Sequence, residues 1–348
     1  MEESRAEALV VTHLPNVFYL CGFTGSNAAL LVFRDQMHLF TDGRYTLQAR
    51  QEASAAHVHI GRQAAVMQAG KLIAGRKHRG ALRAGFDPVH LSQAEWLRLS
   101  ATAGRGVRWK PLAGLVESLR EIKSPDELEA MRRAAKLGSE VMQEVISLVK
   151  PGVSELDLAA EADYRMRRKG ASGPSFDTIV ASGVRTALPH ARPTEKCVKK
   201  NELVVIDLGA ILRHYCSDLT RTVYVGRAPE RVRRWYRAVA EAQKEALHTL
   251  RAGQTAGRVD RAARRVLERY HLGRFFTHST GHGLGTEVHE SPRLGRGQKQ
   301  EIRVGNVVTL EPGIYVEGVG GIRIEDDVAV HASGTEVLTS VPSGLLEL

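Results

Sequence analysis

The run ELVVIDLGAILRHYCSDLTRTVYVG, residues 202–226, contains two apolar β-like segments joined by a short polar connection. Asp207 ends the segment VVID and Asp218 opens the segment DLTRTVYV, so both carboxylates have mostly apolar neighbours. A carboxylate inside an apolar strand is costly unless it is paired, hydrogen-bonded or bound to a metal ion. One such Asp could be an ordinary turn or edge residue. Two of them on adjoining strands indicate a functional site.

A second hairpin is predicted in VVTLEPGIYVEGVGGIRIEDDVAV, residues 307–330, where Gly318 and the Gly320–Gly321 pair supply the turn. Glu311 and Glu325 lie on its two arms. Along the second arm, isoleucines alternate with Arg323 and Glu325, and strand residues two apart point to the same face. Arg323 and Glu325 are therefore expected to share the face opposite the apolar one.

Three histidines, His278, His282 and His289, fall within the run HSTGHGLGTEVHE. The spacing of the first two would suit a helical zinc pair, but the residue after His278 is Ser rather than the Glu of zinc proteases. Three glycines alternate through the run, and each costs a helix about 1 kcal/mol relative to Ala. An irregular or extended segment is therefore predicted. Any one of these histidines alone could be a hydrogen-bonded structural residue.

Together the three stretches supply two Asp, two Glu and at least one His. Four carboxylates that converge on one spot repel one another and cannot all ionise. A dinuclear metal centre removes that conflict, because two ions about 3.5–4 Å apart can share bridging carboxylates. Hard oxygen donors with one imidazole suit Mn(II), Fe(II), Co(II) or Zn(II). The sequence therefore predicts a site for two divalent metal ions.

The N-terminal third of the chain combines apolar β-like runs, EALVVTH and AALLVF, with a strand, a D-G turn and a helix in MHLFTDGRYTLQAR. A further helix is predicted in SQAEWLRLSATA, where Ser92 and Glu95 can form a capping box. The following run, RWKPLAGL, breaks the pattern. We place the domain boundary there, which gives domains 1–114 and 115–348.

The predicted C-terminal domain alternates helix pairs with strands. Its first helix, in KSPDELEAMRRAAKLGSEVMQEVISLVKPG, has Ser124 as N-cap, Pro125 in the first turn and Glu127 closing a capping box. A second helix follows, and two more are predicted over residues 229–252 and 255–270. Strand-rich segments follow each pair, so the predicted fold class is α+β.

The composition is that of a soluble globular protein, with 43% hydrophobic and 25% charged residues in a chain of 348. No apolar run is long enough for a membrane span, and the acidic start lacks the basic region of a signal peptide. The net charge is +10, but the Arg-rich runs alternate with Ala, Val and Leu at helical spacing, which favours solvated helix faces over a nucleic-acid surface. Cys21, Cys197 and Cys216 fit neither a disulfide framework nor a C-x-x-C site, so a cytoplasmic location is predicted.

The candidate ligands resemble the signature of the pita-bread metallopeptidases, which include Xaa-Pro dipeptidase (prolidase), aminopeptidase P, methionine aminopeptidase and the metal-free creatinase. That signature is an Asp, a second Asp eleven residues on, a His in a G-H-x-x-G type segment, a Glu in E-P-G and a Glu in R-x-E. All five are present in order, as Asp207, Asp218, His282, Glu311 and Glu325. YLCGFTGSNAALLV and TDGRYTLQA also resemble the creatinase-like N-terminal domain of prolidases and aminopeptidases P, which methionine aminopeptidases lack.

This resemblance covers nearly the whole chain and implies a C-terminal pita-bread domain after a smaller α/β domain. Family members usually begin with an amphipathic helix, whereas the first strand here starts near residue 7. Either a late start of the chain or a shortened N-terminal domain is therefore expected.

The resemblance implies a metal-binding role for each of the five residues. Asp207 would chelate one ion, Asp218 and Glu325 would bridge both, and His282 and Glu311 would bind the second. Arg323 would pair with the first aspartate and orient it. The implied cofactor is two divalent ions per chain, with Mn²⁺ first and Co²⁺, Zn²⁺ or Fe²⁺ as other candidates.

The same resemblance implies substrate-handling roles. His190, in TALPHARP, matches a histidine near the scissile bond, and His289 matches one that stabilises the tetrahedral intermediate. Glu311 is also a candidate to shuttle the proton of the attacking water. His278 matches a histidine behind the ligands or on the proline side, and Arg293 is a candidate to bind a substrate carboxylate.

The implied reaction is metal-assisted hydrolysis of the Xaa-Pro bond at the N-terminus of a peptide. We favour an aminopeptidase P or a dual Xaa-Pro peptidase, with a strict Xaa-Pro dipeptidase as the alternative. The H-E-x-P-R run around Arg293 discriminates poorly between them, because a similar run also occurs in aminopeptidases P. A non-catalytic pita-bread binding protein is a more remote alternative, since such relatives lose ligands. The expected partners are a proline-containing peptide and a second copy in a homodimer, without nucleic acid or membrane.

Overall fold

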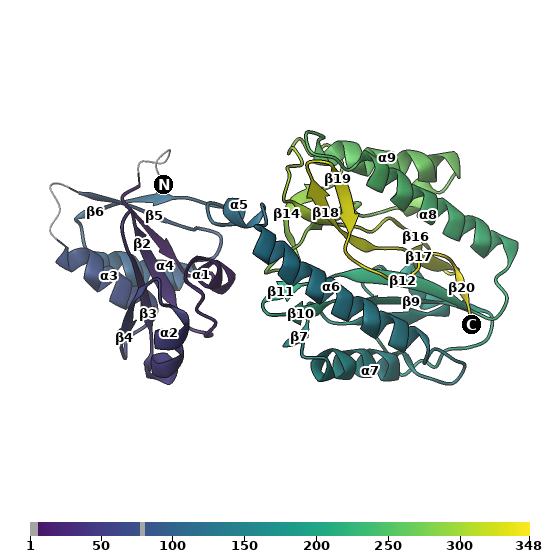
Figure 1. Ribbon diagram of the computed structural model, residues 1–348, viewed down its shortest axis with the longest axis horizontal. Coiled ribbons are helices and arrows are strands. Elements are labelled where there is room, and N and C mark those ends of the chain that lie inside the picture. The colour runs from purple at the N-terminus through teal and green to yellow at the C-terminus, as the bar shows by residue number, and fades with distance from the viewer. Residues whose placement is uncertain (1–5, 77–80) are drawn as a thin grey trace. The chain divides into compact units, whose positions relative to one another are not determined.

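The computed structural model describes residues 6–76 and 81–348. The chain divides into two compact units, Met1–Leu119 and Arg120–Leu348, and each is described by itself (Figure 1). Among the residues that the structure describes, none of the helices combines the length and the apolar character that a membrane crossing needs.

The first unit is built on a six-stranded mixed sheet with strand order β4-β3-β2-β1-β5-β6. Strand β1 pairs antiparallel with β2 and parallel with β5. The strands are β1 (Ala8–Val11), β2 (Ala29–Phe33), β3 (Met37–Thr41), β4 (His57–Ile60), β5 (Leu82–Phe86) and β6 (Val107–Pro111). The helices are α1 (Leu14–Cys21), α2 (Thr46–Glu52), α3 (Ala65–Gly75) and α4 (Gln93–Ala103), and the short α5 (Glu117–Arg120) begins at the end of the unit.

Both faces of this sheet are covered. Ala8 and Val10 pack with α3 and α4, whereas Leu9 and Val11 pack with α1 and α2. Because successive strand residues point to opposite faces, a strand covered on both sides is apolar throughout, as ALVV is. The predicted capping box of α4 is present. The pattern break predicted at RWKPLAGL begins too early, because residues up to 111 form β6, an edge strand that tolerates its proline.

The second unit places its strands between two helix pairs (Figure 1). Helices α6 (Pro125–Ile146) and α7 (Glu155–Arg168) pack on β8 (Ile179–Ser182), β9 (Glu202–Leu208) and β12 (Leu219–Val225). Helices α8 (Glu230–Thr249) and α9 (Ala256–Arg269) pack on β15 (Val307–Leu310), β16 (Gly313–Val316), β17 (Gly320–Arg323) and β18 (Asp326–His331). The predicted Ser124–Glu127 capping box and the proline in the first turn of α6 are confirmed.

Four sheets make up the strands of this unit in the described residues, with orders β20-β12-β9-β8, β14-β13-β15-β18-β19, β11-β10-β7 and β16-β17. The remaining strands are β7 (Gly173–Pro174), β10 (Ala210–Leu212), β11 (Tyr215–Cys216), β13 (Gly281–Gly283), β14 (Glu290–Leu294), β19 (Gly334–Val337) and β20 (Leu346–Glu347). The strand-rich segment 202–212 is two strands that belong to different sheets, and they are separated at Gly209, where a Cβ would lie 2.0 Å from the carbonyl oxygen of Ser217.

Two antiparallel pairs position the predicted site. Strands β9 and β12 lie side by side with Asp207 opposite Thr220, which confirms that the two aspartates come from adjoining strands. Strands β16 and β17 form the predicted hairpin, and Gly318 in its turn has a left-handed backbone with φ of 70°. Glu311 and Glu325 lie just beyond the two arms of this hairpin.

Candidate active site

The structure brings the five predicted ligands to one cavity of about 260 Å³. Each comes from a different place on the strands, near the end of β9, just before β12, inside β13, just after β15 and just before β18. These residues are Asp207, Asp218, His282, Glu311 and Glu325. Residues separated by more than one hundred positions in the sequence thus meet where strands begin or end.

The imidazole of His282 lies among the carboxylates. Its Nε2 is 3.7 Å from Asp218 Oδ2 and 3.7 Å from Glu311 Oε1. Ligand atoms of Asp218, His282 and Glu325 all lie within 4.8 Å of one another. The Nδ1 atom of His282 is 3.0 Å from the carbonyl oxygen of Gly283. A proton on Nδ1 can therefore be donated to that carbonyl, which leaves Nε2 as a lone-pair donor toward the carboxylates.

Arg323 fixes one side of Asp207, as predicted. Its guanidinium donates to Asp207 Oδ2, to Tyr315 Oη at 2.8 Å and to the carbonyl oxygen of Pro189 at 3.0 Å. The other carboxylate oxygen of Asp207, Oδ1, is buried and has no hydrogen-bond partner among the described residues. A buried carboxylate oxygen without a donor is costly, and a cation at this position would satisfy it.

The electrostatics of the cluster favour a bound cation. Burial raises the pKa of Asp218 and of Glu325 well above the usual range, and repulsion from neighbouring carboxylates adds to it. Burial likewise raises the pKa of Glu311 to about 8, although the charge of Arg323 opposes the shift. Burial lowers the pKa of His282 to about 4. Three carboxyl groups that resist ionisation, the carboxylate of Asp207 and a neutral imidazole form a donor set that fits divalent metal ions.

Neighbouring side chains that the sequence analysis missed hold these ligands. Thr220 Oγ1 donates to Glu325 Oε2 at 2.6 Å and accepts from Arg323 Nε at 3.0 Å. The backbone N–H of Asp218 donates to Asp327 Oδ2 at 3.0 Å. A signal for Thr220 existed in the sequence, because it lies two residues from Asp218 and so is expected on the same strand face.

Arg221 fastens the two hairpins together. It is 2% exposed, and its guanidinium donates to the carbonyl oxygen of Glu325 at 2.6 Å and to Asp326 Oδ1 at 2.7 Å. It also donates to the carbonyl oxygens of Val341 and Pro342, at 2.5 and 3.1 Å. The backbone that carries Glu325 is therefore held to β12 by hydrogen bonds between protein atoms.

A second cavity of about 360 Å³ adjoins the ligands and is lined by the predicted substrate residues His190, His278, His289 and Arg293. His278 Nε2 lies 2.9 Å from Tyr315 Oη, and burial lowers the pKa of this histidine to about 4. The rings of His289 and His282 are 4.3 Å apart, edge to face. His190 and His289 line both cavities, so they flank the ligand cluster.

Arg293 is exposed, and no ion-pair or hydrogen-bond partner is seen for its side chain in the described residues. The nearby carboxylate of Glu290 does not neutralise it, because Glu290 accepts from Arg120 at 2.5 Å and from Lys123 at 3.0 Å. A guanidinium in this position can bind a carboxylate of a substrate in bidentate fashion.

The segment around His282 is extended, as its glycines predict. Strand β13 lies between β14 and β15. A Cβ on Gly281 would lie 1.9 Å from the carbonyl oxygen of Thr309, and one on Gly283 would lie 2.1 Å from that of Ser291. Only glycine at both positions lets the neighbouring strands approach closely enough to place His282 in the cavity.

Comparisons with known proteins agree with this geometry. The sequence profile of metallopeptidase family M24 matches residues 129–332, and that of the creatinase/prolidase N-terminal domain matches residues 1–122. An Xaa-Pro dipeptidase from Pyrococcus horikoshii is 33% identical over 350 residues, which cover 99% of this chain and 96% of that protein.

Solved structures are similar over the full length. An Xaa-Pro dipeptidase from Bacillus anthracis has a TM-score of 0.94 and 34% identity, covering 100% of this chain and 96% of that one. An X-Pro aminopeptidase from Thermotoga maritima MSB8 has a TM-score of 0.91 and 34% identity, covering 99% and 98%. The predicted α+β fold, with a pita-bread domain after a smaller domain, is confirmed. The chain belongs to metallopeptidase family M24 and carries the creatinase/prolidase N-terminal domain ahead of its peptidase domain.

Proposed function

We propose that the protein hydrolyses Xaa-Pro dipeptides, as a prolidase. The observation that carries this proposal is the guanidinium of Arg293, for which no partner is seen in the described part of the chain, in the cavity that adjoins the five ligands. A dipeptide presents a free carboxylate one residue beyond the scissile bond, and a longer peptide does not. The names of several similar proteins, Xaa-Pro dipeptidase or prolidase, support the dipeptidase alternative over the aminopeptidase that we favoured from the sequence.

In this proposal the five clustered residues hold two divalent metal ions, with Mn²⁺ as the first candidate. When bound, such ions polarise the substrate carbonyl and lower the pKa of water. Asp218, His282 and Glu325 would supply ligand atoms, and Asp207 would supply its Oδ1, which has no hydrogen-bond partner among the described residues. Arg323 and Thr220 hold the carboxylates in place through the hydrogen bonds described above.

The other residues act on the substrate. Glu311, whose carboxylate lies in the cavity 3.7 Å from His282 Nε2, can take the proton of the attacking water and pass it to the leaving proline nitrogen. His289 and His190 flank the cluster, where they can donate hydrogen bonds to the oxygen that becomes negative. His278 and Arg293 bind the proline side, with Arg293 on the carboxylate.

An X-Pro aminopeptidase is the second candidate function. A structure with that name is as similar in sequence as the Bacillus dipeptidase, at 34% identity. Arg293 is exposed, so a longer peptide could leave the cavity past it.

One substrate panel separates the two functions. Protein stripped with EDTA would be supplied with Mn²⁺, Co²⁺ or Zn²⁺ and assayed on Ala-Pro, Ala-Pro-Ala, Met-Ala-Ser and Ala-Ala-Ala. A prolidase cleaves Ala-Pro and not Ala-Pro-Ala, whereas efficient cleavage of the tripeptide would assign an aminopeptidase P. Failure on every peptide with every metal would favour a non-catalytic binding protein.

The role of Arg293 has its own test. Arg293→Gln is expected to raise KM for Ala-Pro about 10- to 100-fold, because a hydrogen bond to a charged group contributes about 1.5–3 kcal/mol. The KM for Ala-Pro amide, which lacks the carboxylate, should change little. Arg296→Gln, at an exposed arginine three residues away, serves as the control. Equal effects of Arg293→Gln on both substrates would contradict carboxylate binding.

The homodimer and the cytoplasmic location stay predictions.

A further inference from the structure

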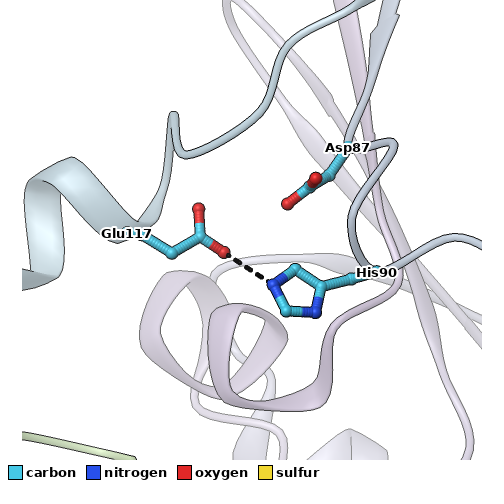
Figure 2. Close-up of side chains that lie close together, drawn as sticks. All are labelled: Asp87, His90 and Glu117. Carbon is cyan, nitrogen blue, oxygen red and sulfur yellow. Dashed lines mark ion pairs between the residues drawn. The ribbon is translucent and has the colours of Figure 1, made fainter. Parts of the chain in front are cut away.

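A second cluster of metal-ligating side chains lies in the first unit, remote in sequence from the peptidase residues. Asp87 and His90 follow β5, and Glu117 opens α5 (Figure 2). One ligand atom from each residue lies within 4.8 Å of the other two. His90 Nε2 is 3.5 Å from Glu117 Oε1, and Figure 2 shows the Asp87 carboxylate turned toward the same space.

Local contacts hold the loop that carries two of these residues. Asp87 Oδ1 accepts from the backbone N–H of Val89 at 2.8 Å, which leaves the other carboxylate oxygen for a ligand. Thr12 Oγ1 donates to the carbonyl oxygen of His90 at 3.3 Å. The His90 ring stacks on His13 with ring centroids 3.7 Å apart. The imidazole is therefore positioned by stacking while its Nε2 edge faces Glu117.

The carboxylate of Glu117 is only partly satisfied by its neighbours in the described residues. Its Oε1 accepts from Asn16 Nδ2 at 2.6 Å, and Asn16 is itself 1% exposed. Its Oε2 is buried and has no hydrogen-bond partner in the part of the chain that the structure describes. In those same residues the structure shows one ion-pair partner for Glu117, which is His90. When the imidazole is neutral it does not balance the charge of this carboxylate.

We propose that Asp87, His90 and Glu117 bind one divalent transition-metal ion, Zn²⁺ by preference, separate from the two catalytic ions. Zinc takes histidine nitrogen and carboxylate oxygen at about 2.0–2.2 Å, and water completes the coordination of a site with three protein ligands. Atoms that share such an ion lie within about 4 Å of one another. The ligand atoms here need to approach by less than about 1 Å, which side-chain rotation can provide. The ion would tie the loop after β5 to residue 117.

Metal counting on the full chain tests the proposal. Protein saturated with Zn²⁺ and desalted should carry three ions per chain by mass spectrometry, and His90→Gln should carry two. His248→Gln, at an exposed histidine on α8, is the matched control and should retain three. A His90→Gln protein with the wild-type metal count would overturn the proposal, and so would a wild-type chain that holds no ion beyond the catalytic pair.

A second measurement isolates the new site from the catalytic one. A chain with Asp218→Ala and Glu325→Ala should still bind one Co²⁺, seen as visible d–d absorption, and adding His90→Gln should remove that signal. If the double variant does not fold, Glu117→Gln in the otherwise unchanged chain supplies the same test, because it should lose one ion while cleavage of Ala-Pro is kept. Loss of no ion in Glu117→Gln would mean that His90 is only an ion-pair partner of the two carboxylates.

Discussion

The chain holds two clusters with the same kinds of donor atoms at different depths. In the peptidase cluster Asp207, Asp218 and Glu325 are only 6%, 5% and 2% exposed. In the first unit the side chains of His90 and Glu117 are 28% and 27% exposed. The distances from histidine nitrogen to carboxylate oxygen are nevertheless similar, 3.7 Å in the peptidase cluster and 3.5 Å in the cluster of the first unit.

Depth changes what a metal ion would do at each place. The peptidase carboxylates are buried around their cavity, so burial, with mutual repulsion added to it, raises the pKa of Asp218 and Glu325 in the absence of a cation. In the first unit the side chains are partly exposed, although Glu117 Oε2 is buried, and an ion there would mainly connect two segments of chain. The comparison therefore predicts that loss of metal from the peptidase cluster changes activity and stability strongly, and that loss of metal from the cluster of Asp87, His90 and Glu117 changes them little.

The largest effect is expected from removing a carboxylate that both catalytic ions would share. Asp218→Ala or Glu325→Ala should lower kcat/KM more than about 10³-fold, which corresponds to about 4 kcal/mol of transition-state stabilisation. Metal content should fall in parallel. Activity assays and metal counting on the same preparation check this. A normal metal count in either variant would contradict the assignment of that residue as a metal ligand.

A smaller effect is expected at His289, which touches the ligand cluster without belonging to it. His289→Ala should reduce kcat by about 10²-fold, as expected for loss of one donor to a developing oxyanion, with both ions still bound. Steady-state kinetics with metal analysis would show it. A change in KM alone would assign His289 to ground-state binding instead.

The pH dependence of stability should distinguish the metal-free chain from the loaded one. The folded pKa of Glu311 is raised to about 8, so between about pH 4.5 and 8 the folded state keeps a proton that the unfolded state has released. The stability of the metal-free protein should therefore fall as pH rises through this window and level off above it. Asp218 and Glu325 shift in the same direction.

With Mn²⁺ bound, the same carboxylates are ionised in the folded state, and this loss should disappear. Thermal unfolding of EDTA-treated and Mn²⁺-loaded protein from pH 5 to 8.5 gives the test. Glu311→Gln is the matched variant and should reduce the slope of the metal-free curve, with Asp218 and Glu325 responsible for the slope that is left. Parallel curves for the loaded and the metal-free wild type would show that the carboxylates are not coupled to the metal.

The smallest effect is expected at the cluster of the first unit. His90→Gln should change kcat/KM for Ala-Pro by less than about twofold, since exposed substitutions away from a reaction centre have small effects. It should, however, abolish the rise in unfolding temperature that Zn²⁺ gives to Mn²⁺-loaded protein through binding to the folded state. A large loss of activity in this variant would show that the two clusters are coupled and that the cluster of the first unit does affect the reaction.

The sequence predicted the peptidase site better than its surroundings, for a physical reason. Carboxylates in apolar strands and histidines among glycines are locally unusual, so Asp207, Asp218 and His282 stand out without a structure. The contacts that hold them are not local. Arg221 looks like an ordinary strand residue. The spacing of Thr220 from Asp218 places it on the same strand face, but only the structure shows that Thr220 and Arg221 hydrogen-bond to Glu325.

The first unit shows the same limit. Strand β4 has the sequence HVHI with an exposed residue at each end, so no apolar pattern marks it. The cluster of Asp87, His90 and Glu117 joins residues that lie 30 positions apart, each unremarkable in its own loop or helix. Both features follow from tertiary pairing, which local sequence patterns do not encode.

The buried guanidinium of Arg221 has a consequence for metal choice. Because it fastens Glu325 and Asp326 to the neighbouring hairpin through protein atoms alone, the ligand frame exists before any ion arrives. Ion binding then offsets the repulsion among the carboxylates without first having to order the chain, and one divalent ion can replace another without the chain rearranging. Affinity for such ions follows the general order of transition metals rather than a fit to one of them. The concentrations of the available divalent ions would therefore decide which one occupies the site, and exchange of one ion for another would leave the protein structure unchanged.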